Sequence, residues 1–173
     1  MLDIGLPANL QPVIWFGLAS ACARALGVLA VEVTRRRVDM VSKESLMRAL
    51  QVISVLLVVS ICALSLAAQW WLALLLYCVE RALHAGSQPL YYTWLNLHID
   101  QPNVRATIFS INSQMDAIGQ VFGGPTSGAV GERLGLRAAL LSSALLLLPV
   151  VPLYALLLRK SRVGEESEGT GSV

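Results

Sequence analysis

Charged residues are scarce in this chain of 173 amino acids, and their scarcity excludes several classes of protein. Only 14% of the residues are Asp, Glu, Lys or Arg, whereas 55% are hydrophobic. The net charge of +2 is too small to indicate nucleic-acid binding, and no basic patch with interleaved aromatic residues occurs. The charges fall between long apolar runs and the mean hydropathy is +0.64, which is typical of a polytopic membrane protein.

Cysteine is also rare, and its placement favours neither a disulfide framework nor a metal site. Cys22, Cys62 and Cys78 are odd in number, lack ligand spacing and lie inside apolar runs, so we expect small buried hydrophobic side chains. The sequence contains no G-x-S-x-G, H-E-x-x-H or P-loop motif. We therefore predict no metal, no cofactor and no enzymatic activity. A pair of membrane-embedded acids, Glu80 and Asp116, is the remaining enzymatic hypothesis.

Apolar runs long enough to cross a bilayer occur five times. A span needs about 20 residues, and its backbone must be hydrogen-bonded within the chain, so the sequence predicts an all-α fold. The first 12 residues lack the basic start and cleavage site of a secretory signal, so the first run is expected to remain as a span. The transmembrane region is residues 1–158, and residues 159–173, rich in Glu, Ser and Gly, are expected to form a disordered cytoplasmic tail. The predicted spans are about 13–33, 46–67, 70–95, 106–130 and 134–158.

Lysine and arginine are unevenly divided between the two sides of the predicted bundle. One side carries only Arg133 and Arg137. The other side carries Arg35, Arg36, Arg37, Lys43, Arg48, Arg105, Arg159, Lys160 and Arg162. Because these residues concentrate in cytoplasmic connections, we expect a plasma or inner membrane protein with its amino terminus outside and its carboxyl terminus in the cytoplasm. Tryptophans near span ends are expected to act as interfacial anchors. They are Trp15, Trp70, Trp71 and Trp94.

The fourth predicted span carries an acid near its middle. Asp116 lies beside Gln114 and Gln120, and an ionisable residue in hydrocarbon is normally kept where it faces protein or a watery path. We therefore expect a polar patch that faces a cavity. The alternatives for Asp116 are a hydrogen bond to Gln120 and a contact between helices.

Glycines are frequent in the second half of the same span. Gly119 with Gly123, and Gly124 with Gly128, form two overlapping small-xxx-small pairs, which allow other helices to approach closely. We expect one face of this helix to be packed against neighbours. The alternative is a hinge that bends as a gate opens, with Pro125 as its weak point.

The third predicted span has one polar stripe, which is expected to border an aqueous route for protons or solute. Glu80 and His84 are the candidates for proton exchange near neutral pH. Pro89 is expected to kink this helix or to loosen its hydrogen bonds. The stripe consists of Tyr77, Glu80, Arg81, His84, Ser87, Gln88 and Tyr91.

Arg24 in the first span is the best candidate for a buried partner of an acid. It belongs to a face of small or polar residues at helical spacing: Gly17, Ser20, Ala21, Arg24 and Gly27. Glu80 pairs either with Arg24 or with Arg81, and such a pair would fix helix register. The competing hypothesis is a direct role in moving substrate or protons.

The fourth predicted span contains a run of motif residues: Arg105-Ala106-Thr107, Ser113-Gln114, Asp116-Ala117, Gly119-Gln120, Gly123-Gly124-Pro125 and Gly128. This run resembles the eleventh helix of a major facilitator superfamily transporter of the bacterial drug or sugar efflux type. The basic run at 35–37 looks like that family's loop between helices eight and nine, and the turn at 131–135 looks like the loop before helix twelve. The resemblance covers about residues 10–158.

The resemblance implies a secondary transporter built of two six-helix halves, with a small molecule bound between them at the midplane. This chain would supply about helices eight to twelve, and proton-coupled efflux is the implied activity. The family's Gly, Asp and Arg loop pattern is reduced here to 35–37 with Asp39. The first half and one helix of the second half are absent, so the expected partners are the bilayer, the solute and a separate chain with the missing helices.

The predicted substrate and proton pathway combines the positions implied by the resemblance with the embedded charges. It comprises Arg24, Glu80, Arg81, His84, Gln88, Asn112, Asp116 and Gln120. The alternative function is a membrane scaffold or partner subunit that does not transport and that assembles through its glycine-rich helix faces.

Overall fold

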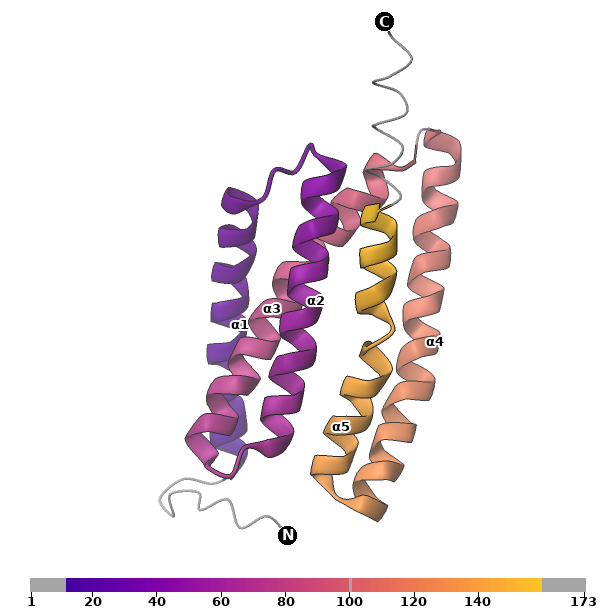
Figure 1. Cartoon of the computed structure of the whole chain (residues 1–173). Coiled ribbons are helices and arrows are strands. Elements are labelled where there is room, and N and C mark those ends of the chain that lie inside the picture. Colours follow the sequence, from indigo (N-terminus) through magenta and orange to yellow (C-terminus); the bar gives the residue numbers. More distant parts are fainter. Residues whose placement is uncertain (1–11, 100, 160–173) are drawn as a thin grey trace, which may run out of the picture.

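The computed structural model describes residues 12–99 and 101–159, and within these ranges all regular secondary structure is helical (Figure 1). The predicted all-α fold is therefore confirmed. The predicted tail lies, apart from Arg159, outside the described residues. Five helices follow one another along the chain: α1 Pro12–Arg37, α2 Lys43–Leu66, α3 Trp70–Leu97, α4 Pro102–Leu134 and α5 Leu136–Leu147.

Local chemistry fixes the helix ends. The Ser42 hydroxyl accepts a hydrogen bond of 3.2 Å from the backbone N–H of Ser45 and so caps the start of α2. Gly135 separates α4 from α5 and has φ of 88°, a conformation that glycine adopts without a Cβ clash. The turn expected over 131–135 is therefore shorter than predicted, because α4 continues to Leu134.

The last predicted span is interrupted in the structure. Helix α5 ends at Leu147, a turn occupies residues 148–149, and helical residues resume at 150–159. Pro149 lacks a backbone N–H and cannot continue the helical hydrogen bonding, which accounts for the break.

The five helices pack in the spatial order α1, α3, α2, α5, α4. Figure 1 shows α1, α2 and α3 as one group, with α4 at the opposite edge of the molecule beside α5. Helices that are adjacent in sequence are thus not always adjacent in space, because α3 lies between α1 and α2. The molecule consists of a three-helix group joined to a two-helix pair through the contact of α2 with α5.

The best-buried cluster lies between α2 and α3. Leu46, Leu50 and Leu90 are 0, 3 and 0% exposed. Trp94 packs against them, and its indole nitrogen has no hydrogen-bond partner in the described part of the chain. Trp94 is thus partly buried against the leucines of α2 and α3, and its role as an interfacial anchor stays a prediction. Trp71, by contrast, is 54% exposed.

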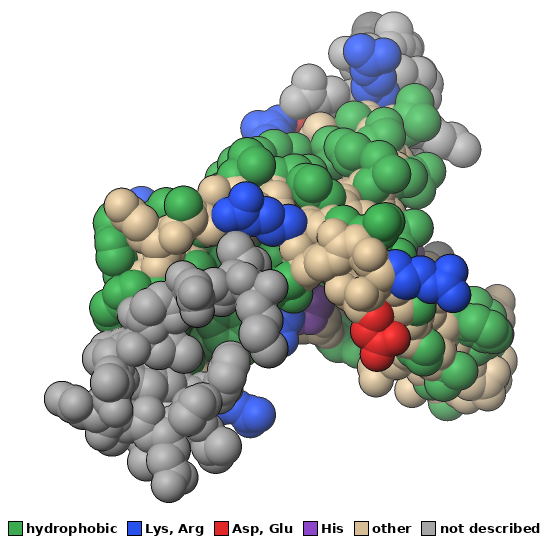
Figure 2. Space-filling view, turned by 90° about the horizontal axis from the view of Figure 1, so that it is seen from below, with side chains coloured by type: hydrophobic (Ala, Val, Ile, Leu, Met, Phe, Trp, Pro, Cys, Tyr) green, Lys and Arg blue, Asp and Glu red, His purple; other side chains and the backbone are tan. Residues whose placement is uncertain are grey.

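Three segments are long and apolar enough to cross a membrane: Gly17–Arg37, Lys43–Leu66 and Leu136–Arg159. Helices α3 and α4 are long enough but their polar faces lower their mean hydropathy. Large apolar side chains are exposed over the surface, and Figure 2 shows them from below as extensive green areas. Such exposure marks a surface that contacts lipid or protein, so the three apolar segments indicate association with a membrane.

The basic residues gather at one end of the molecule. The connection of α1 to α2, the connection of α3 to α4 and the end of the 136–159 segment all lie at the top of Figure 1. Arg35–Arg37, Lys43, Arg105 and Arg159 belong to this end. Arg133 and Arg137 lie at the other end, where α4 meets α5. The uneven division predicted from the sequence is thus present in space, and the orientation in a membrane stays a prediction.

Candidate functional site

Helices α1 and α3 approach each other closely at two glycines. A Cβ added to Gly27 would lie 3.2 Å from the Cβ of Ala85, and one added to Gly86 would lie 3.1 Å from the Thr34 hydroxyl oxygen. Both distances are tighter than ordinary contacts, so small residues are needed at this crossing. The predicted small-residue face of the first span therefore packs at Gly27, whereas a Cβ at Gly17 would meet nothing within 4 Å.

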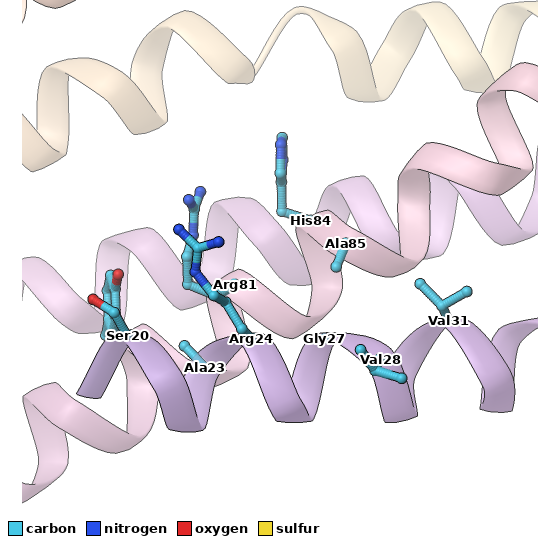
Figure 3. A pocket seen from close by; sticks show the side chains of 10 residues that line it. Ser20, Ala23, Arg24, Gly27, Val28, Val31, Arg81, His84 and Ala85 are labelled. Carbon is cyan, nitrogen blue, oxygen red and sulfur yellow. The ribbon is translucent and has the colours of Figure 1, made fainter. Parts of the chain in front are cut away.

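A recess of about 390 Å³ opens beside this crossing. In Figure 3 the side chains of Arg24, Arg81 and His84 point to the same side of the α1–α3 pair. From below, Figure 2 shows a histidine and a cationic side chain inside a hollow of the surface. The rest of the lining is mostly small and apolar: Ser20, Ala23, Gly27, Val28, Val31, Tyr77 and Ala85.

The acid of this region is paired within its own helix. Arg81 donates from Nε to Glu80 Oε2 at 2.9 Å and from Nη2 to Glu80 Oε1 at 3.2 Å. The Glu80 side chain is 15% exposed and that of Arg81 is 46% exposed. Of the two partners proposed for Glu80, the structure therefore selects Arg81. The prediction of Arg24 as a buried partner of an acid is wrong, because Arg24 is exposed and forms no ion pair with any described residue.

Several α4 residues that the sequence singled out share one side of the helix. Asn112, Asp116, Gly119 and Gly123 are separated by three or four residues and so share a side of the helix. The Tyr91 hydroxyl of α3 donates a hydrogen bond of 2.6 Å to Asn112 Oδ1, and the Tyr92 ring stacks on that of Phe109. The polar face of α4 is therefore turned toward the polar stripe of α3 at this level, and Asp116 lies one turn further along the same face.

Asp116 has a partner on its own helix. Gln120 donates from Nε2 to Asp116 Oδ2 at 3.0 Å, and both residues are exposed. This hydrogen bond is the first of the two alternatives predicted for Asp116. On α3, His84 and Gln88 are exposed as well, whereas Asn112 is half-buried by its contact with Tyr91.

The glycines of α4 have no neighbours. A Cβ at Gly119, Gly123, Gly124 or Gly128 would meet nothing within 4 Å, and no described side chain of α4 is buried. No described residue of this chain packs against these glycines, so the expected packing of this face against neighbouring helices stays a prediction. Among the described helices, α5 is the one that contacts α4 extensively. Near their shared turn a Cβ added to Gly131 would lie 3.6 Å from the Cβ of Ala139.

Helix α4 runs without interruption across Pro125. The Thr126 hydroxyl donates to the Phe122 and Gly123 carbonyl oxygens at 2.6 and 3.0 Å, just before the proline. These two hydrogen bonds are not among the sequence predictions, although a threonine directly after the proline is a visible signal. The bond between Tyr91 and Asn112 was not predicted either, since nothing in the pattern pairs two residues 21 positions apart.

Among the described residues no group of three or more His, Cys, Asp or Glu side chains is placed to hold a metal ion. Cys22 is exposed rather than buried, so the expectation for that cysteine is wrong, while Cys78 is buried. A second hollow of about 370 Å³ lies between α2 and α5 and is lined by Cys62, Ser142 and apolar residues without any charge.

No protein-family model, curated protein or solved structure matches this chain. Function must therefore be inferred from the chain itself.

Proposed function

We propose that this chain is the carboxyl-terminal part of a proton-coupled efflux transporter of the major facilitator superfamily, embedded in the plasma or inner membrane. In this proposal all five helices cross the bilayer. Helices α3 and α4 do so with their polar faces turned away from lipid. The resemblance of the α4 residues to that family supports the proposal, and the three strongly apolar segments are compatible with it.

The observation that carries the proposal is the bareness of α4. This helix of 33 residues has four glycines with nothing within 4 Å, and it also exposes large apolar side chains such as Met115 at 59% and Phe122 at 68%. Glycine costs helix stability, and in membrane helices it is used where another helix approaches. We therefore infer that further helices, from a separate chain or segment, pack against the α4 glycines near Asp116. A transporter built of two halves would provide such helices.

The distribution of basic residues supports an orientation for the proposed transporter. The end with Arg35–Arg37 and Arg159 is the cytoplasmic end by the excess of arginine and lysine there. The amino terminus of α1 then lies outside. The recess beside Arg24 lies nearer to the outer end of the membrane, since Arg24 is closer to Gly17 than to Arg37 in the apolar segment.

A scaffold or partner subunit that does not transport is the second candidate function. The hydrogen bond from Gln120 to Asp116 favours it, because this acid already has a partner and needs no proton traffic to be tolerated. Both candidates use the glycine face of α4, which consists of Gly119, Gly123, Gly124 and Gly128, to bind other helices. They differ in whether solute moves.

A flux measurement separates them. The chain is expressed together with any membrane protein encoded directly upstream, and inside-out vesicles are assayed with a pH-sensitive dye against a panel of solutes. We expect solute-dependent proton movement that Asp116→Asn or Glu80→Gln abolishes while membrane insertion is normal. Glu132→Gln, an exposed carboxylate at the end of α4, is the matched control and should retain flux. If flux persisted in both variants, the co-expressed protein would be the one that carries it, and the scaffold would be favoured. The absence of flux with any solute would favour the scaffold as well.

A further inference from the structure

We propose that the recess between α1 and α3 binds a small carboxylate with an apolar body, and that Arg24 supplies the charge that holds it. The proposal rests on the proposed transport function, for which it names the class of solute. The juxtaposition that carries it is a set of nitrogen-bearing side chains from two helices that point into one recess with mainly apolar walls.

The lining of the recess carries an excess of positive charge. Three basic side chains line the recess, Arg24, Arg81 and His84, while no Asp or Glu does. Arg81 is neutralised by its two hydrogen bonds to Glu80, but Arg24 has no acid among the described residues. An arginine inside an apolar segment is costly unless an anion accompanies it. The recess thus has one cation more than it can neutralise from its own lining.

The volume of the recess and its mainly apolar wall suit a small molecule with a hydrocarbon body. A volume of about 390 Å³ is within the range of small-molecule sites, which start at about 300 Å³. Ala23, Val28, Val31 and Ala85 provide an apolar wall, and Ser20 and Tyr77 add hydroxyl groups. A guanidinium matches a carboxylate because two of its N–H groups can bond both oxygens. The apolar wall then suits a hydrocarbon body attached to that carboxylate.

Two acids of α3 and α4 could compete with an incoming anion for Arg24, but each has another partner. Asp116 lies on the polar face of α4 and accepts its hydrogen bond from Gln120. It is not part of the recess lining, and no described ion pair joins it to Arg24. Glu80 is half-buried and directed to Arg81. Neither acid therefore fills the place that an incoming anion would take.

The test measures binding of benzoate to the purified full chain in zwitterionic nanodiscs by calorimetry. Benzamide and benzylamine serve as neutral and cationic probes of the same size. We expect benzoate to bind and the other two not to bind. Arg24→Gln should weaken benzoate binding by roughly tenfold or more, because a charge-assisted hydrogen bond is lost. Arg24→Lys should retain part of it, and Arg137→Gln, an exposed arginine outside the recess, should retain all of it.

Three results would overturn the proposal: no benzoate binding to the wild-type chain, equal binding of benzamide, or unchanged binding in Arg24→Gln. Nanodiscs with anionic lipid form the last arm, and complete loss of benzoate binding there would identify a lipid headgroup as the occupant instead. Circular dichroism of each variant confirms that the helices are intact. Charge-selective binding without solute flux would leave this site standing and remove the transport proposal, whereas flux of uncharged solutes without benzoate binding would do the reverse.

Discussion

Glycine has opposite surroundings in the three-helix group of α1, α2 and α3 and in the pair of α4 and α5. In the first group, Gly27 and Gly86 sit where a Cβ would press on the neighbouring helix, at 3.2 and 3.1 Å. In α4, Gly119 and Gly124 have nothing within 4 Å. A glycine in a helix lowers its stability and is useful only where a backbone must come close. The first group is therefore packed within this chain, whereas α4 lacks such contacts among the described residues, and we propose that it packs against neighbours outside the chain.

Removing a core leucine from the first group should have the largest effect on stability. Leu90→Ala, at a position that is 0% exposed, should lower the free energy of unfolding by about 2–5 kcal/mol because it leaves a cavity between α2 and α3. Leu146→Ala in α5, where the side chain is 71% exposed, should change it by less than about 0.5 kcal/mol. Unfolding by denaturing detergent, followed by circular dichroism in micelles, measures both. Equal losses would remove the distinction between the two regions.

Adding a side chain to the glycines should sharpen the contrast. Gly86→Leu should cost about 1–3 kcal/mol of unfolding free energy, because the new side chain overpacks the contact with Thr34. Gly124→Leu should instead stabilise the isolated chain by up to about 1 kcal/mol, since leucine is the better helix former and nothing blocks it. Thermal unfolding of the two variants in the same detergent tests the pair. A destabilising Gly124→Leu in the isolated chain would show that α4 already has a neighbour.

The pair of Glu80 and Arg81 should contribute less than the core leucine. A double-mutant cycle with Glu80→Gln and Arg81→Gln should give a coupling energy of about 1 kcal/mol, because Glu80 is 15% exposed while Arg81 remains 46% exposed. The matched cycle on Glu32 and Arg36, whose side chains are 50 and 78% exposed, should give about 0.3–0.5 kcal/mol. If both cycles gave the same coupling energy, the partial burial of Glu80 would have no consequence.

Asp116→Asn should have the smallest effect on stability. Its hydrogen bond from Gln120 is exposed on a bare helix, so the unfolding free energy of the isolated chain should change by less than about 0.5 kcal/mol. The same variant should abolish flux in the assembled transporter, and the two measurements together separate structure from function. A loss of stability above about 2 kcal/mol would assign Asp116 to internal packing and contradict the bareness of α4.

Periodic and compositional features of the structure could be predicted from the sequence. Apolar runs and their breaks located the first four helices to within about four residues, but they did not predict the break at 148–149 in the last span, and the spacing of the charges found the polar stripe of α3. The end at which the basic residues gather was also predictable, because helix direction alternates along the chain.

Pairing in space could not be predicted from these patterns. Arg24 was assigned a partner by charge alone, whereas Glu80 reaches the neighbouring Arg81 on its own helix. The contact of Tyr91 with Asn112 depends on how α3 and α4 lie, which a one-dimensional pattern does not contain. The spacing of the α4 glycines predicts that other helices can approach them closely, but it does not identify the neighbouring helix.

Cross-linking from α4 in the host membrane tests the central claim most directly. Cysteine is placed at Gly124, or at Leu146 as the control, in a background in which Cys22, Cys62 and Cys78 are replaced. The account predicts that a bismaleimide joins the residue-124 cysteine to another chain with transmembrane helices, while the residue-146 cysteine stays uncross-linked and reactive with a lipid-soluble maleimide. If the cysteine at 124 behaved like that at 146, the glycine face would contact lipid and the account would be contradicted.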